Sequence, residues 1–184
     1  MLSKFQAYGR ERHALESIMR IQAVKRWHMI DTTRTQNLAE HSANVAMLAM
    51  LIALSAPIEF FDDPILAAAV GLVHDLPEAF TGDIPSHTKK MLEGFDRLEK
   101  AVTPSGFALS ARPSTIMLVK MCDIADGIRF IRLHGVDMTA VHAREGLEDQ
   151  MLKILQSAEH DHYWPEHVII HVKDHVMFYA YERS

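Results

Sequence analysis

Cysteine is nearly absent from this chain of 184 residues, with Cys122 as the only one. A single thiol excludes a disulfide framework within one chain, and it excludes a zinc site built from several thiolates. Long hydrophobic runs are absent as well. The most apolar stretch, Val45 to Leu54, is shorter than the ~20 residues that span a bilayer, and Pro57 follows closely. We therefore expect a reducing, cytoplasmic location and no membrane partner.

An excess of positive charge is also missing, since 19 basic residues stand against 24 acidic ones, for a formal net charge of -5. This balance gives no support for a surface that binds a nucleic-acid polymer. The start of the chain, MLSKFQAYGRERHALES, has no apolar core behind a basic cluster and predicts no signal peptide. The length and a hydrophobic content of 48% suit one globular domain, so we expect a single domain over residues 1–184.

Strand-type alternation is not sustained, whereas apolar residues recur at helical spacing almost throughout. The chain is therefore predicted to be all-α, a bundle of about six to seven helices. Asn37 and Glu40 form a capping box, Pro64 suits a first helical turn, Ser114 is a predicted N-cap, and Gly135 is predicted at a C′ position. With these boundaries, helices are predicted at residues 12–26, 37–55, 64–80, 86–102, 114–134, 137–157 and 165–181.

Ionisable residues occur on the apolar faces of three predicted helices. His41 lies on one inward stripe, His74, Asp75 and Glu78 interrupt a second, and Asp123 lies on a third. The stripe that carries Asp123 is Ile116, Val119, Asp123, Gly127 and Phe130. Burying an unpaired carboxylate is energetically unfavourable, so the charged groups on the three helices need a common source of compensating charge. A divalent metal (Mn, Fe, Co, Ni or Zn) held by His41, His74, Asp75 and Asp123 provides it and leaves positions open for water and substrate.

Two alternatives compete with this metal site. Any one of the four residues alone suits a hydrogen-bonded core histidine or a simple ion pair; the occurrence of all four favours the metal. A second histidine pattern lies in the C-terminal part of the chain. His167, His171 and His175 recur at every fourth position, and His160 and His162 lie just before them. No carboxylate matches their face, so we expect a subunit-contact surface or adventitious metal binding there.

The order His41, His74-Asp75, Asp123 in a helical chain resembles the HD-domain metal phosphohydrolase superfamily. Three segments, RWHMIDTTRTQNLAEHS (26–42), HDLPEAFTGDIPS (74–86) and VKMCD (119–123), resemble the bacterial 5′-deoxynucleotidases. This similarity covers roughly residues 21–132. Residues 137–181 match weakly, and we expect them to serve packing and assembly.

One departure from the bacterial pattern is a shorter segment between Asp83 and Asp123, which compact phage relatives share. Some of these resemble dATP triphosphohydrolases, and the sequence at residues 27–30, WHMI, is closer to that branch. The resemblance therefore implies a metal-dependent phosphohydrolase of 2′-deoxynucleotides. The preferred expectation is a dATP triphosphohydrolase that releases triphosphate. Such an enzyme would act on the nucleotide pool in the host cytoplasm, as in phages. The alternatives are a 5′-deoxynucleotidase, a metal-containing nucleotide sensor without turnover, and a structural bundle without metal.

The resemblance also implies roles for single residues. Glu78 is the expected general acid/base, against the alternative of a solvated carboxylate at a helix end. Pro77 is expected to kink the predicted helix and to aim Glu78. Arg26 is expected to neutralise phosphate, and Trp27 to pack on the sugar or base and exclude a 2′-hydroxyl, although tryptophan is more often a core residue.

Further substrate contacts are expected from Asp83, Thr81 and Ser86, at the sugar hydroxyl or the phosphate edge; a turn followed by a helix cap is the alternative. Lys89, with Lys90 and Arg34, is an expected source of positive charge for a triphosphate, as is an additional Mg²⁺. For Asp126 we expect a surface or capping role rather than a second metal site. The Met- and Phe-rich helices and the aromatic C-terminal segment favour a homo-oligomer.

Overall fold

The computed structural model describes residues 12, 15–16, 18–57, 59–104, 107–160 and 164–182. Within these ranges the chain is helical, and its extended pairings are isolated bridges, which confirms the all-α prediction. The named helices are α2 (Leu38–Ser55), α3 (Pro64–Val73), α4 (Glu78–Thr81), α5 (Ser86–Met91), α6 (Phe95–Val102), α7 (Pro113–His134), α8 (Met138–His160) and α9 (Glu166–Tyr181).

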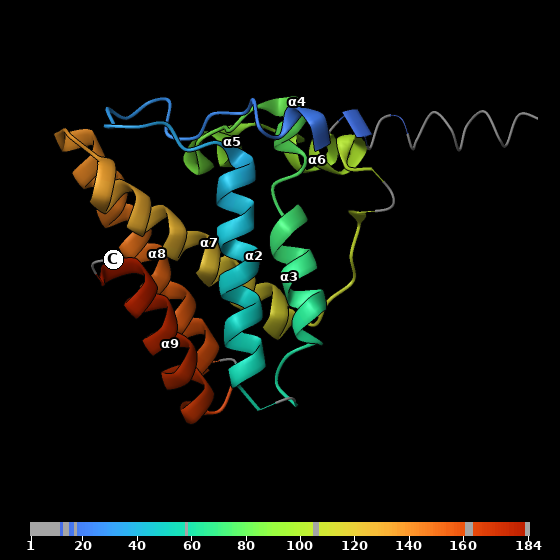
Figure 1. Cartoon of the computed structure of the whole chain (residues 1–184), viewed down its shortest axis with the longest axis vertical. Coiled ribbons are helices and arrows are strands. Elements are labelled where there is room, and N and C mark those ends of the chain that lie inside the picture. Colours follow the sequence, from blue (N-terminus) through green and yellow to red (C-terminus); the bar gives the residue numbers. More distant parts are fainter. Residues whose placement is uncertain are drawn as a thin grey trace, which may run out of the picture.

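The long helices form a bundle around α2 and α7 (Figure 1). Helix α2 packs against α3 and α7, and α7 packs against α8 and α9. The short helices α4, α5 and α6 gather at one end of the bundle, beside the start of α2. The core between the long helices is built from large apolar side chains such as Val45, Ile52, Leu118, Met121 and Val172.

Helix α2 begins where predicted, because the Asn37 side chain accepts a hydrogen bond from the backbone N–H of Glu40 at 2.9 Å. The second half of the predicted capping box is not formed, since the Glu40 carboxylate pairs with Arg34. By length and composition alone α2 could cross a membrane, but half of it is buried inside the structure. Gly71 of α3 allows a close approach to α2, since a Cβ there would lie 2.9 Å from the Cα of Ala46. The middle of α2 therefore packs closely against α3.

The prediction of one continuous helix over residues 64–80 is wrong. Helix α3 ends at Val73, and a turn over residues 74–77 precedes α4. Pro77 has no N–H to offer the carbonyl of Val73, which instead accepts from the N–H of Leu76 at 3.0 Å. Proline thus ends the helix instead of kinking it. The predicted stop at Gly82 is present, with φ of 75° and its N–H donating to the Glu78 carbonyl.

The predicted helix over 86–102 is also divided, into α5 and α6, at Gly94 with φ of 78°. Among the described residues of 12–26, helical structure ends at Arg20 and turns follow. Lys25 then pairs with Asn37 in an isolated bridge, which places the next residues beside the start of α2. Division of two predicted helices explains why the named helices outnumber the six to seven expected.

Helix α7 differs from its prediction at both ends. It begins at Pro113 after Arg112, while the hydroxyl of Ser114 donates to the Phe60 carbonyl at 2.7 Å instead of capping the helix. Gly135 follows the helix with φ of -68°, so it is not a left-handed cap. Glycine is required there for space, since a Cβ would lie 2.6 Å from the Cβ of Ala140.

Candidate functional site

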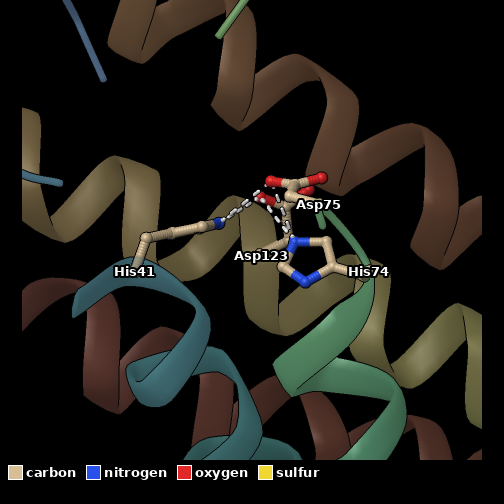
Figure 2. A group of neighbouring side chains, drawn as sticks. All are labelled: His41, His74, Asp75 and Asp123. Carbon is tan, nitrogen blue, oxygen red and sulfur yellow. Dashed lines mark ion pairs between the residues drawn. The ribbon is translucent and has the colours of Figure 1, made fainter. Parts of the chain in front are cut away.

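Four predicted metal ligands converge from three parts of the fold (Figure 2). His41 lies in the first turn of α2, His74 and Asp75 in the turn after α3, and Asp123 in the middle of α7. One ligand atom of each lies within 4.8 Å of all the others. His41 Nε2 lies 3.1 Å from Asp123 Oδ1, and His74 Nε2 lies 3.2 Å from Asp75 Oδ2. The structure therefore brings together the complete set expected from the sequence.

Both imidazoles present the same nitrogen to this centre. The Nδ1 atom of His74 donates to the Gly71 carbonyl at 2.7 Å, and Nδ1 of His41 donates to Asp126 Oδ2 at 2.7 Å, because both partners are acceptors. The two Nε2 atoms are buried and have no hydrogen-bond partner. Holding Nδ1–H on a carbonyl or carboxylate is how proteins orient histidine ligands. These residues fit a divalent transition metal.

Charge balance within the centre favours ionised carboxylates. Burial alone would lower the pKa of His74, but the charges of Asp75 and Asp123 raise it to about 9. Burial alone would raise the pKa of Asp75, but the charge of His74, whose Nε2 lies 3.2 Å away, holds it well below its usual range. Burial likewise opposes ionisation of Asp123, yet the contact with His41 at 3.1 Å and the charge of Lys120 lower its pKa. The carboxylates are therefore ready to bind a cation.

Asp126 is not on the surface, so the expected surface or capping role is wrong. Its side chain is buried, and its two oxygens accept hydrogen bonds from four donors. Oδ2 accepts from His41 Nδ1 and Gln36 Nε2, and Oδ1 accepts from Asn44 Nδ2 and the Tyr179 hydroxyl, at 2.7 to 2.9 Å. Asp126 therefore binds the ring nitrogen of His41 that does not face the metal centre, and it links α2, α7 and α9.

The Arg26-Trp27 pair is held in the segment before α2. Arg26 is buried, and its Nη1 lies 2.9 Å from Asp75 Oδ2, so it faces the same carboxylates as the candidate metal. Trp27 has φ of 60°, a strained conformation for a residue with a Cβ. Its backbone N–H donates to Asp83 Oδ2 at 3.2 Å, and its indole N–H donates to Gln36 Oε1 at 2.9 Å. These bonds fix the tryptophan ring beside the metal centre.

Glu78 begins α4 and is only 3% exposed, which contradicts the alternative of a solvated carboxylate. Oε1 pairs with Lys89 Nζ at 2.7 Å, whereas the buried Oε2 has no hydrogen-bond partner. Burial and the neighbouring charge of Asp75 raise the pKa of Glu78 to about 7, although Lys89 acts in the opposite direction. A carboxyl group with this pKa can both accept and donate a proton near neutral pH.

A cavity of about 510 Å³ opens in front of these groups. Of the expected substrate contacts, Arg26, Trp27, Asp83 and Lys89 line it. Thr81 is not among the lining residues and donates its hydroxyl to the Gly82 carbonyl. The side chain of Ser86 lies outside the described part of the structure.

Sequence reasoning missed other parts of the cavity wall. Lys120 lines the cavity and pairs with Asp123 Oδ2 at 2.5 Å, and its position one turn before Asp123 could have identified it. Another part of the wall comes from α8, whose residues His142, Gly146 and Gln150 carry no recognisable sequence motif. Among the other cations considered, Arg34 pairs with Glu40 at 2.5 Å and is not among the cavity-lining residues.

The C-terminal histidines do not form a comparable centre where they are described. His171 Nε2 lies 3.2 Å from the Ser55 hydroxyl, and His175 Nδ1 donates to the His171 carbonyl. His167 contacts the ring of Phe60 edge-on. Within the described residues, the group formed by His41, His74, Asp75 and Asp123 is the one whose ligand atoms cluster for a metal. His162 lies outside the described residues.

Comparison with known proteins gives consistent results. A protein of Salmonella phage PMBT28 named dATP triphosphohydrolase is 33% identical over 161 residues, which cover 83% of this chain and 82% of that protein. A 5′-deoxynucleotidase of Erwinia tasmaniensis is 34% identical over 79 residues, 42% of this chain and 40% of that protein. The solved Cyanophage S-2L HD phosphohydrolase DatZ, bound to dA and one catalytic Zn²⁺ ion, superposes with a TM-score of 0.70 at 26% identity, covering 89% of this chain and 91% of that one.

The sequence profile of a hydrolase family matches residues 13–105, half of the chain. This stretch includes the segment with Arg26 and Trp27, helix α2 with His41, and the turn with His74 and Asp75. The chain belongs to the 5′-deoxynucleotidase YfbR-like family.

Proposed function

We propose that this protein is a metal-dependent phosphohydrolase of 2′-deoxynucleotides, with dATP as the leading substrate and deoxyadenosine and triphosphate as products. The observation that carries the proposal is the group of four metal-binding side chains at a cavity of about 510 Å³, with buried Glu78 in the same wall. The extent of similarity favours dATP, because the phage dATP triphosphohydrolase matches over most of its length, whereas the Erwinia 5′-deoxynucleotidase matches over less than half.

In this proposal His41, His74, Asp75 and Asp123 hold the divalent ion. Such an ion supplies Lewis acidity at a phosphoryl oxygen and a nucleophile near neutral pH. Glu78 takes up a proton from the attacking water or delivers one to the leaving group; its unpartnered Oε2 and its pKa of about 7 support both uses.

The phosphates are proposed to lie among three cations of the cavity wall, Arg26, Lys89 and Lys120. Arg26 presents a planar guanidinium suited to two phosphate oxygens, and the two lysines add further positive charge. An additional Mg²⁺ would serve the rest of a triphosphate.

Trp27 and Asp83, with Thr81 and Ser86 nearby in the sequence, are proposed to face the sugar. The ring of Trp27 is fixed through Gln36 and cannot easily withdraw, so it is suited to exclude a 2′-hydroxyl by shape.

A second candidate function is removal of one phosphate from a deoxynucleoside monophosphate. The family match over residues 13–105 favours it, since that stretch contains the ligands His41, His74 and Asp75 and the candidate acid/base Glu78. A nucleotide sensor that binds without turnover is less well supported, because a buried glutamate with an elevated pKa serves no purpose in binding an anion.

Product analysis tests these functions. The protein, loaded with Zn²⁺, Co²⁺ or Mn²⁺ in turn, is given dATP or dAMP, and the released phosphate, pyrophosphate or triphosphate is identified. Triphosphate from dATP is the expected product. Phosphate from dAMP alone would establish the 5′-deoxynucleotidase, and no turnover of either substrate with metal shown to be bound would refute the enzyme.

We also propose a cytoplasmic homo-oligomer that binds neither a nucleic-acid polymer nor a membrane. Exposed apolar side chains on α2 and α9, including Met47, Leu51, Leu54 and Phe178, support self-association. Light scattering of the purified protein tests it, and a monomer at micromolar concentration would contradict it.

A further inference from the structure

Helix α8 forms one wall of the cavity that the metal ligands Asp75 and Asp123 also line. His142, Gly146 and Gln150 line it at intervals of four residues, so they share one face of the helix. Ala143 and Leu147 lie beside them in the same wall. This end of the cavity offers an apolar surface with a few polar side chains, which is typical of a site for a ring-shaped organic group.

Gly146 is the least expected residue of this wall. Glycine in the interior of a helix is unfavourable relative to alanine, so its presence needs a reason. Gly71 and Gly127 have one, because an added Cβ would lie about 3 Å from neighbouring atoms. A Cβ on Gly146 would meet nothing within 4 Å, and its backbone is not left-handed. The described chain does not require glycine there, and the position lines the cavity.

The two polar residues on this face are available to a ligand. His142 and Gln150 make no side-chain hydrogen bond with the described part of the chain, although both line the cavity. An amide offers one acceptor and two donors, which match the amino group and the ring nitrogen on one edge of adenine. The corresponding edge of guanine presents two acceptors and cannot satisfy the amide oxygen.

We propose that the face of α8 formed by His142, Gly146 and Gln150 is the nucleobase subsite and selects adenine. Gly146 leaves room for the ring to lie against the helix, and Gln150 binds its amino edge. The ring of Trp27 and the side chain of Leu147 both line the cavity and meet at Gly127 of α7, where an added Cβ would lie 3.2 Å and 3.0 Å from them. This inference rests on the proposed function, because it places the phosphates of the same nucleotide at the metal end.

The subsite is tested with Gly146→Ala, in which a methyl group enters the space proposed for the base. Binding of deoxyadenosine, which has no phosphate, is measured by calorimetry on the Zn²⁺-loaded protein, and the KM for dATP is measured in parallel. We expect the Kd and the KM to rise about 10-fold, as for an overpacked site. The melting temperature should rise, because alanine favours the helix. Glu145→Ala, at an exposed neighbouring position of α8, is the matched control and should leave Kd and KM unchanged.

Gln150→Leu provides a second, independent measurement. It should lower the preference for dATP over dGTP, expressed as a ratio of kcat/KM values, by about 10-fold, the amount expected for a lost two-point contact with a base.

The outcomes separate this inference from the proposed function. Unchanged deoxyadenosine binding in Gly146→Ala, or wild-type protein that binds no deoxyadenosine, would overturn the subsite. Wild-type protein that binds deoxyadenosine and loses it in Gly146→Ala, but hydrolyses neither dATP nor dAMP, would refute the proposed function and leave the subsite standing.

Discussion

The two ends of the cavity are built differently. At the metal end, Asp75, Asp123 and Glu78 each have a cationic partner, and the imidazole of His41 is held from behind by Asp126. At the α8 end, His142 and Gln150 have no side-chain partner within the described chain. The metal end is thus fixed by the protein itself, as chemistry at a phosphoryl group requires, whereas the α8 end keeps its hydrogen-bonding groups available for a ligand.

Removing the metal should have the largest effect, and it should impair the metal end of the cavity without impairing the α8 end. A chelator is expected to abolish turnover of dATP and to lower the melting temperature, since a ligand at a thousand times its Kd stabilises by about 4 kcal/mol. Binding of deoxyadenosine at α8 should persist. Turnover assays, thermal unfolding and calorimetry on the same metal-free sample measure the three effects, and Zn²⁺ should restore the first two. Turnover without detectable metal would contradict this division.

Glu78→Gln should remove turnover while leaving binding at both ends. The amide has nearly the same shape as the carboxyl group but cannot exchange a proton, so kcat should fall by about 10² to 10⁴. Bound Zn²⁺, measured by elemental analysis, and the Kd for deoxyadenosine should match those of the wild type. Equal turnover by the variant would exclude Glu78 as the acid/base.

Asp126→Asn tests whether the metal end depends on the carboxylate behind His41. Asparagine has one acceptor oxygen for the four donors that Asp126 satisfies, so buried donors are left facing an amide N–H₂. Loss of such a support typically weakens metal binding by about 10- to 100-fold. Zn²⁺ affinity is measured by competition with a chromophoric chelator.

Tyr179→Phe is the matched control for Asp126. It removes one donor to the same carboxylate but leaves the bond to His41, so Zn²⁺ affinity should remain close to that of the wild type. Equal Zn²⁺ affinity in Asp126→Asn would show that His41 is oriented without Asp126.

The metal end could be predicted because its residues break a pattern. His41, His74, Asp75 and Asp123 are ionisable groups in apolar helical stretches, and burying them apart is unfavourable enough that they must meet. The turn over residues 74–77 could not be predicted as readily. A proline inside an apolar run either kinks a helix or ends it. Here the helix ends, because the Val73 carbonyl accepts a hydrogen bond from the N–H of Leu76 in a turn.

Asp126 was missed because α7 is not amphipathic in the ordinary sense. Neighbours cover it on several sides, so Asp123 and Asp126 are both inside while Ile116, expected to face inward, is 53% exposed. The α8 wall was missed for the opposite reason. His142 and Gln150 are ordinary residues for an exposed helix face, and the lack of a side chain at Gly146 gains meaning only from the cavity in front of it.

The smallest expected effect concerns the pairing of Glu78 with Lys89 at the metal end. The charge and hydrogen bond of Lys89 lower the pKa of Glu78, against the effects of burial and Asp75 that raise it. Lys89→Met should therefore raise the pKa of Glu78, and the limb of the pH profile of kcat that belongs to Glu78 should move to higher pH, whether it acts as base or as acid. Lys90→Met, at the exposed next position, is the control and should leave the profile in place. Both variants are assayed with Zn²⁺ bound, so the effect of the ion is common to them. An unshifted profile in Lys89→Met would mean that this lysine does not tune Glu78 and serves the phosphates alone.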